Sequence, residues 1–271
     1  MYPGREVFLH APLVYVTAEI TLSYEPRVNQ PAVRDAFAEG VRQTFPLLQQ
    51  ERALAVKLEE VDEDIPPQVL PALRAFTADS EASVLLKASA LTVDTTSYTQ
   101  FEKFDAFLGV ALAALAESVP GAMVRRVGVR YVNEIRVPGE TAADPDWPTW
   151  VSDSLLAAQG LLPSGHAAGS MGHVLFHLED DCWTGFRYGD VIGTTIVDRD
   201  VAVRRKKSAE PENSRFFALD IDSFWDPSEP VKFDPDQIVK ICDRLHRPAG
   251  ELFQASITER ARKHFRGDPD E

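Results

Sequence analysis

The chain has 271 residues, and its 28 Lys and Arg against 42 Asp and Glu give a formal net charge of −14. This acidic balance excludes a protein whose whole surface grips nucleic acid or anionic lipid. Hydrophobic residues make up 44% of the chain and charged residues 26%, close to the averages for folded soluble proteins, so disorder is excluded as the main state.

The cysteine content and the N-terminal sequence indicate a reducing compartment. Cys182 and Cys242 lie far apart and form no C-x-x-C motif, so no disulfide framework is expected. Residues 7–22 are interrupted by polar residues and proline, unlike a signal peptide, and no apolar run is long enough to cross a bilayer. We therefore expect a soluble, cytoplasmic protein that does not associate with membranes.

The first elements are a strand and a helix. Residues Leu13 to Tyr24 alternate between apolar and polar side chains, which predicts a half-buried strand. Pro31 then opens a stretch in which apolar residues, Val33, Phe37, Val41 and Phe45, recur at a spacing of four. This spacing predicts a helix that packs on a sheet.

Strands and a second helix are expected next. Ala53 to Val61 alternates, prolines at 66, 67 and 71 indicate a loop, and Leu73 to Thr95 is expected to hold two strands joined by a turn at 79–81. Thr99 and Glu102 stand at the spacing of a capping box, which predicts that a helix begins there and continues to Pro120.

The clearest strand runs from Val124 to Val137. Val127, Val129, Tyr131 and Ile135 share one face with Asn133 among them, whereas Arg126, Arg130, Glu134 and Arg136 lie on the other face. Residues 138–148 are rich in Pro, Gly and acids, which marks a boundary.

The second half is predicted to be an antiparallel meander followed by helices. Strands are expected at His173–Glu179, Cys182–Tyr188, Val191–Lys206 with an interruption, and Arg215–Ser223. Helices are expected at Asp234–Leu245 and Ala249–Phe265, separated or kinked by Pro248.

These elements predict an α+β fold of mainly antiparallel sheets covered by long amphipathic helices, in two halves of similar size. The N-terminal half would span residues 1–140 and the C-terminal half residues 149–265, and residues 266–271 would be a frayed tail. Whether the halves are a duplication stays open.

Several phrases together resemble a known family. They are APLVYVTAEITLSYEP, SVLLKASALTVDTTSYTQFEKF, RRVGVRYVNEI, FFALDID and LHRPAGELFQASITERARKHF. In this order they resemble a sporadically distributed, functionally uncharacterised bacterial protein family. The resemblance implies a cytosolic prokaryotic protein of patchy occurrence, such as the cargo of a defence or mobile-element cluster, and it supplies no catalytic residues.

Asp220 and Asp222 are the first candidates for chemistry. Strand alternation places both carboxylates on one face, about 7 Å apart at Cα, where they could converge on a divalent cation. Because Leu219 and Ile221 fill the opposite face, two solvated acids would give the same pattern. They are weak metal candidates, and no metal or cofactor is expected.

The histidines give weaker signals. His173 and His177 are four residues apart, but their alternating context predicts a strand, in which they are about 13 Å apart and do not chelate one metal ion. His246 near Glu259 could serve as a base, but a histidine at a helix C-terminus before Pro248 is explained more simply by the helix dipole.

Basic residues are concentrated at two places despite the net charge. Arg126 and Arg130 lie on the central strand, and Arg204 and Arg205 begin a second cluster. Together they would form a local basic patch that holds phosphate, nucleic acid or an acidic partner. The alternative is that Arg126 and Arg130 pair with acids such as Glu19 on neighbouring strands.

We expect a non-enzymatic binding or adaptor protein that recognises another macromolecule, in the first instance a protein. The expected binding residues are Arg126, Arg130, Tyr131, Asn133, Glu134, Arg204 and Arg205. Asn133 is included because an amide on an otherwise apolar face needs a partner. Two alternatives are a metal-dependent phosphodiesterase or nuclease that uses Asp220 and Asp222, and a small-ligand protein with a pocket beneath its long helices.

Overall fold

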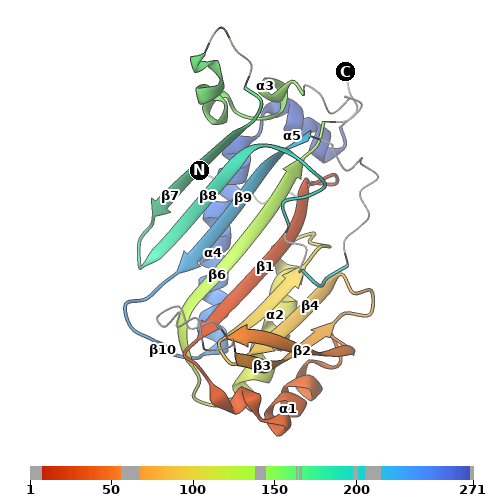
Figure 1. Cartoon of the computed structure of the whole chain (residues 1–271), viewed down its shortest axis with the longest axis vertical. Coiled ribbons are helices and arrows are strands. Elements are labelled where there is room, and N and C mark those ends of the chain that lie inside the picture. Colours follow the sequence, from red (N-terminus) through yellow and green to blue (C-terminus); the bar gives the residue numbers. More distant parts are fainter. Residues whose placement is uncertain are drawn as a thin grey trace.

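A computed structural model of the chain describes residues 8–55, 68–137, 145–162, 164, 167–197, 201–204 and 215–268. Its centre is a ten-stranded sheet with the order β2-β3-β4-β5-β1-β6-β9-β8-β7, and β10 also pairs with β6 (Figure 1). The strands are β1 (Leu13–Leu22), β2 (Leu47–Ala55), β3 (Gln68–Phe76), β4 (Ala82–Lys87), β5 (Ala90–Thr95), β6 (Met123–Ile135), β7 (Ser170–His177), β8 (Cys182–Ile192), β9 (Arg215–Trp225) and β10 (Val231–Lys232).

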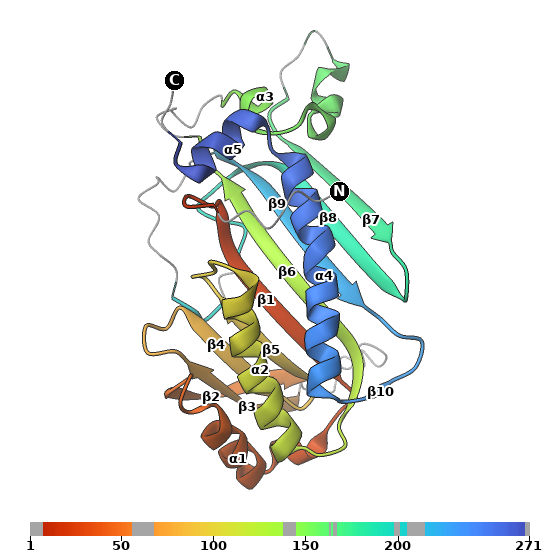
Figure 2. The same ribbon diagram turned by 180° about the vertical axis from the view of Figure 1, so that it is seen from behind.

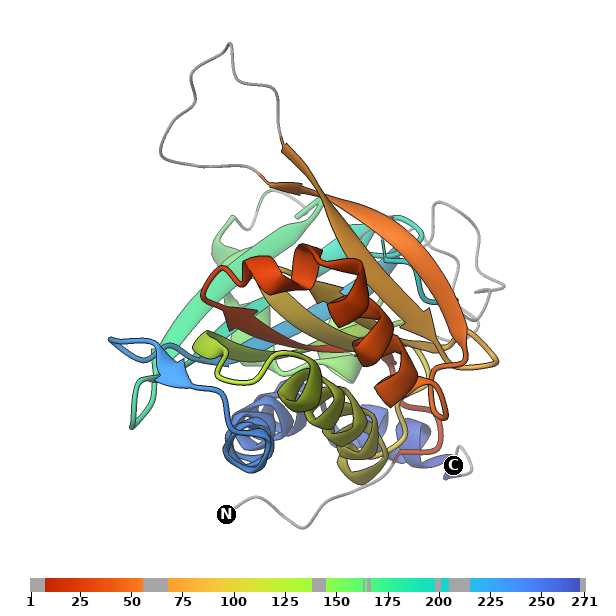
Figure 3. The ribbon, with the colours of Figure 1, turned by 90° about the horizontal axis from the view of Figure 1, so that it is seen from below.

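Helices cover one face of this sheet. They are α1 (Pro31–Val41), α2 (Phe101–Ser118), α3 (Trp147–Trp150), α4 (Pro235–Ser256) and α5 (Glu259–Arg266), with short 3-10 turns η1 (Pro26–Asn29), η2 (Asp153–Leu155) and η3 (Ala157–Leu161). The long helices α2 and α4 lie side by side on the same face, and α1 packs beside α2 (Figures 2 and 3). We call this the helix face and the opposite side the open face.

The alternation of the central strands explains this arrangement. Val16, Ala18 and Ile20 of β1 are completely buried in the core beneath the helices, as expected for a strand with one buried face. Gly40 allows α1 to pack closely against α2, because a Cβ at this position would lie only 2.8 Å from Cβ of Ala114.

The expected α+β class with a large antiparallel sheet is confirmed, and so are the strands around β1, β6, β7 and β9. The expected halves meet where β6 pairs with β9 in antiparallel register, from Val127 opposite Trp225 to Ile135 opposite Phe217. One core cluster contains side chains from both ranges. The two predicted halves share one continuous sheet, and their division stays a prediction.

Two predictions in the first half were wrong. Residues 73–95 form parts of three strands, because the chain turns again at Ala88 and Ser89 between β4 and β5. Pro71 lies within β3 instead of a loop, opposite Arg52 of the edge strand β2. An edge or near-edge position tolerates a residue without an N–H.

The helix boundaries also differ from expectation. The capping box is absent, since α2 begins at Phe101 after Gln100 and has no side-chain cap hydrogen bond. Pro248 does not separate two helices, because α4 continues through it to Ser256. Proline removes one backbone hydrogen bond, and packing on the sheet holds the helix together.

The expected strand at Val191–Lys206, with its interruption, is wrong for the described residues after Ile192. β8 ends at Ile192, and residues 193–197 and 201–204 form a non-strand connection, here called the crossing loop. It passes over the open face, where Val197 and Val203 pack on Tyr15, Phe76 and Val132. The loop thus gives the open face a small second core.

Within the described part of the chain, no helix has both the length and the apolar character needed to cross a membrane.

Candidate functional site

The sheet divides the predicted binding residues between its two faces. Tyr131 and Asn133 lie on the helix face and line a pocket. Arg126, Arg130 and Glu134 alternate with them and occupy the open face, as the sequence pattern predicted. The structure therefore assigns the predicted set to two separate places.

On the open face, Asp220 is the centre of an ion-pair cluster. Arg130 donates from Nε to Oδ1 of Asp220 at 2.7 Å and from Nη2 to Oδ2 at 2.9 Å. Arg187 of β8 approaches the same Oδ2 at 2.8 Å. The Asp220 side chain is only 7% exposed, so this carboxylate is almost fully enclosed by its two arginines.

A second pair lies beside this cluster. Arg126 donates to Oδ2 of Asp222 at 3.3 Å and lies over the ring of Phe224, 4.3 Å from its centroid. The alternative that the arginines pair with acids is confirmed, but the acids are Asp220 and Asp222 of β9 and not Glu19.

These contacts argue against a cation at the aspartate pair. Both oxygens of Asp220 already accept hydrogen bonds from guanidinium groups, whose charge would repel an incoming metal ion. No group of three or more His, Cys, Asp or Glu suited to a metal ion occurs among the residues that the structure describes. At Asp220, guanidinium groups therefore take the place that a divalent cation would need.

Glu134 holds the crossing loop. Its Oε1 accepts hydrogen bonds from Thr195 Oγ1 at 2.6 Å and from the amide of Ile196 at 2.9 Å, and its Oε2 accepts from Arg136 at 2.9 Å. The side chain is 4% exposed. A buried acid with these partners positions the loop and is not available to an external ligand.

Arg204 lies at the far end of the same loop. Its amide donates to the carbonyl of Ser80 at 2.7 Å, and its carbonyl accepts from Thr96 Oγ1 at 2.6 Å, while the residue as a whole is exposed. Arg205 lies outside the described residues. The expected basic cluster is thus defined only at its first member.

Beneath the crossing loop lies a buried polar cluster that the sequence did not indicate. Asp94 accepts hydrogen bonds from Tyr15 at 3.1 Å and from Ser83, and Ser83 also accepts one from Arg74 at 2.8 Å. Burial raises the pKa of Asp94 and, with the nearby Asp94 charge, the pKa of the Tyr15 phenol. The cluster joins strands β1, β3, β4 and β5 on the open face.

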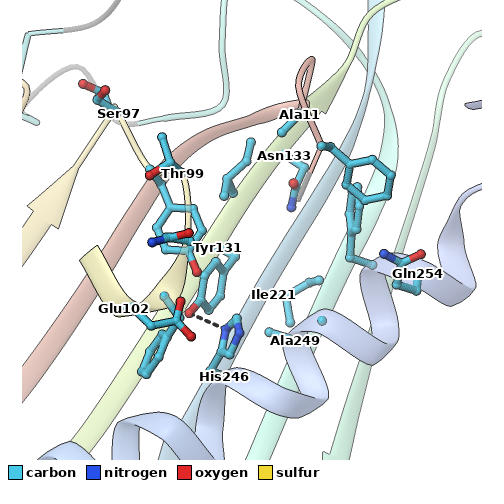
Figure 4. A pocket seen from close by; sticks show the side chains of 18 of the residues that line it. Ala11, Ser97, Thr99, Glu102, Tyr131, Asn133, Ile221, His246, Ala249 and Gln254 are labelled. Carbon is cyan, nitrogen blue, oxygen red and sulfur yellow. Dashed lines mark hydrogen bonds between the residues drawn. The ribbon is translucent and has the colours of Figure 1, made fainter. Parts of the chain in front are cut away.

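The helix face contains a pocket of about 710 Å³ between the sheet and α4. Its walls come from residues of the first described segment, the connection into α2, β6, β9 and the second half of α4; Figure 4 shows ten of them labelled, from Ala11, Ser97, Thr99 and Glu102 to Tyr131, Asn133, Ile221, His246, Ala249 and Gln254. A volume of this size matches a drug-sized organic molecule.

At the base of the pocket, Tyr131 and His246 form a hydrogen-bonded pair. The phenol oxygen lies 2.8 Å from Nδ1 of His246 (Figure 4). The His246 ring stacks on Phe101 with a centroid distance of 4.6 Å, and Tyr98 meets the Tyr131 ring edge-on at 5.8 Å. Aromatic packing therefore fixes the orientation of both members.

The environment of Tyr131 keeps its phenol protonated. Burial raises the pKa of Tyr131 well above its ordinary value, and Tyr98 adds to this effect. The neutral phenol can donate to Nδ1 or accept from it, according to the tautomer of the imidazole. The hydrogen-bonding role of the phenol oxygen is thus linked to the tautomer of His246.

The thiol one turn before His246 is not an activated nucleophile. Cys242 is completely buried, and desolvation raises the pKa of its thiol, with a further contribution from Asp105. A protonated, inaccessible thiol neither attacks a substrate nor binds a metal.

Two amides complete the polar lining. Asn133 is 4% exposed and donates from Nδ2 to the carbonyl of Leu219 at 3.3 Å, so its amide has a partner within the chain. Gln254 on α4 has a buried Oε1 without a hydrogen-bond partner among the residues that the structure describes. An unpaired buried oxygen is costly and favours a donor from a bound molecule or water.

Sequence reasoning found Tyr131 and Asn133 and missed the rest of the pocket. His246 lies within α4, not at its C-terminus, so the helix-dipole explanation was wrong. Its position three residues before Ala249 and seven before Phe253 places it on one helical stripe, and these residues all line the pocket. A polar residue on an otherwise apolar stripe was the available signal.

A comparison of the chain with protein-family models and with curated proteins finds no match.

Proposed function

We propose that the protein binds a small organic molecule in the pocket between the sheet and α4. The observation that carries this proposal is the buried, aromatic-braced Tyr131–His246 pair at the base of a pocket of about 710 Å³. A largely apolar cavity with a few convergent polar groups is typical of ligand sites. The pocket takes Tyr131 from the expected N-terminal half and His246 from the C-terminal half, and we retain the two-half organisation as part of this proposal.

The charge of the lining selects the class of ligand. Of the described residues that line the pocket, none is Lys or Arg, and Glu102 is an acid. A carboxylate or phosphate would lose its hydration there without gaining a permanent cation. The ligand is therefore neutral or cationic, with an apolar body that packs against Phe101 and Phe253.

The polar atoms orient this ligand. The Tyr131–His246 pair offers a donor or an acceptor according to the tautomer, and Gln254 Oε1 offers an acceptor at another wall. A ligand that donates a hydrogen bond to Gln254 would satisfy this oxygen while its apolar body packs beside the Tyr131–His246 pair.

Binding of the neutral apolar dye Nile red tests the proposal. We expect a fluorescence increase with the wild-type protein and its loss in Ala249→Phe, whose new ring would occupy the pocket. Ala255→Phe is the matched control, because Ala255 is exposed on the same helix. Circular dichroism shows whether each variant is folded.

Two further results bear on the same experiment. The anionic dye anilinonaphthalene sulfonate should bind the wild-type protein less well than Nile red, because none of the described lining residues supplies a permanent cation. If folded Ala249→Phe and Ala255→Phe bind Nile red equally well, the dye does not enter this pocket, and the proposal would then be abandoned.

A second candidate function is recognition of a macromolecule by the open face. Three arginines share two aspartates there, and Arg187 is 56% exposed whereas Arg126 is 30% exposed. The cluster has one more positive than negative side chain, so we propose that it contacts an acidic group on a protein partner.

Fluorescence anisotropy with an acidic peptide and with a DNA oligonucleotide tests this second candidate. We expect the acidic peptide to bind in low salt, and we expect Arg187→Glu to weaken binding strongly. Lys240→Glu changes the charge equally at an exposed position of α4, on the opposite face of the sheet, and serves as the control. Tight binding of the oligonucleotide alone would favour nucleic acid, and no binding of either probe would remove the candidate.

A further inference from the structure

The edge strand β7 has an unusual position in the sheet. It pairs with β8 along its whole length, from Ser170 opposite Asp190 to His177 opposite Trp183. Among the described strands no other one pairs with β7, so its second edge carries backbone donors and acceptors without a strand partner (Figure 1). Such an edge is a template for strand addition.

Apolar side chains of β7 are exposed on both faces of the sheet. Met171 and Leu175 on the open face are 85% and 54% exposed, and Val174 and Phe176 on the helix face are each 38% exposed. The helix α4 packs on β6, β8 and β9, and β7 lies beyond it (Figure 2). Four large apolar residues on one exposed strand are more than single surface residues explain.

The strand also lacks the features that normally protect an edge. Ser170–His177 contains no Lys, Arg, Asp, Glu or Pro. The opposite edge strand, β2, carries Glu51 and Arg52. Charged side chains on an edge strand prevent pairing with another chain, and β7 has none of them.

We propose that β7 is the contact between two copies of this chain, paired in antiparallel orientation about a two-fold axis. Repulsion between two chains of net charge −14 is weakest where no charged side chains meet, and β7 carries none. A two-fold axis also requires a self-complementary surface, and the residue pattern of β7 provides one.

The complementary register places Val174 opposite Val174 of the partner subunit. In that register Gly172 lies opposite Phe176 of the partner subunit, on the helix face. At Gly172 an added Cβ would lie 2.3 Å from the ring of Tyr188, so Tyr188 covers this glycine. The incoming phenylalanine would then pack beside the tyrosine, an aromatic contact typical of cross-strand pairs.

The oligomeric state in solution tests this inference. Analytical ultracentrifugation over a wide micromolar range should show a dimer for the wild-type chain. Val174→Lys and Val174→Glu should each weaken dimerisation at least about tenfold, because like charges would then face each other across the axis. Leu48→Lys, at an exposed leucine of the opposite edge strand β2, should leave the dimer unchanged.

Mixing the two variants tests the register itself. An equimolar mixture of Val174→Lys and Val174→Glu should restore a dimer, since opposite charges then meet at the axis. A wild-type chain that stays monomeric at all concentrations would overturn the inference and leave the edge to a different protein. Dimeric Val174→Lys would also overturn it, and a mixture that stays monomeric would refute the Val174 register.

Discussion

Replacing Asp220 by asparagine tests whether the ion-pair cluster stabilises the open face. The carboxylate accepts two hydrogen bonds from Arg130 at 2.7 and 2.9 Å and is approached by Arg187 at 2.8 Å. Asparagine keeps the shape of the side chain and one oxygen, but its NH2 group would face a guanidinium. The negative charge that offsets the repulsion between Arg130 and Arg187 would be lost.

The expected magnitude follows from these contacts. A hydrogen bond to a charged group contributes about 1.5–3 kcal/mol, and asparagine retains only one neutral acceptor. Because Arg187 is 56% exposed, part of the loss is screened by solvent. We expect Asp220→Asn to lower the free energy of unfolding by about 2–3 kcal/mol, which moves the urea midpoint by about 1 M.

Asp222→Asn is the matched control for this measurement. Its side chain is 35% exposed and has one guanidinium contact, at 3.3 Å. Exposed pairs contribute at most about 1 kcal/mol, so the control should change stability by less than this amount. Equal losses for the two variants in urea denaturation would refute the idea that Asp220 is the centre of the cluster.

A double-mutant cycle identifies the cause of the loss. If repulsion between Arg130 and Arg187 destabilises Asp220→Asn, then Arg187→Met should restore part of its stability. Strictly additive effects of the two substitutions would contradict this explanation.

Three other outcomes follow from the structure. Gly40→Ala should lower the free energy of unfolding by about 1–3 kcal/mol, because its Cβ would lie 2.8 Å from an atom of α2. Gly109→Ala, whose Cβ would have no atom within 4 Å, should be neutral or stabilising. Thermal denaturation of both variants checks these two expectations. Millimolar Mg²⁺ or Mn²⁺ should leave the melting temperature unchanged, because guanidinium groups occupy Asp220; a rise that Asp220→Asn abolishes would revive the nuclease reading. Glu134→Gln should weaken the hold on the Ile196 amide, so hydrogen exchange at that amide should accelerate, and an unchanged rate would contradict the role of Glu134.

The sequence alone determined the faces of the central strands. Alternation in β6 separated Arg126, Arg130 and Glu134 from Tyr131 and Asn133, because successive side chains of a strand point to opposite sides. It also placed Asp220 and Asp222 on one face of β9. These features depend on neighbouring residues only, so a local pattern is enough to predict them.

Only the tertiary structure decided which partners meet. The ion pairs of Asp220 join β6, β8 and β9, and the pocket brings β6 beside α4, so both depend on strand order and helix placement across long stretches of chain. The same reason explains the errors at Pro248 and His246. Packing of α4 on the sheet overrides the local preference of proline to end a helix, and it places His246 within hydrogen-bond distance of Tyr131. Local propensity is a difference of a few kcal/mol at most, and burial against the sheet exceeds it.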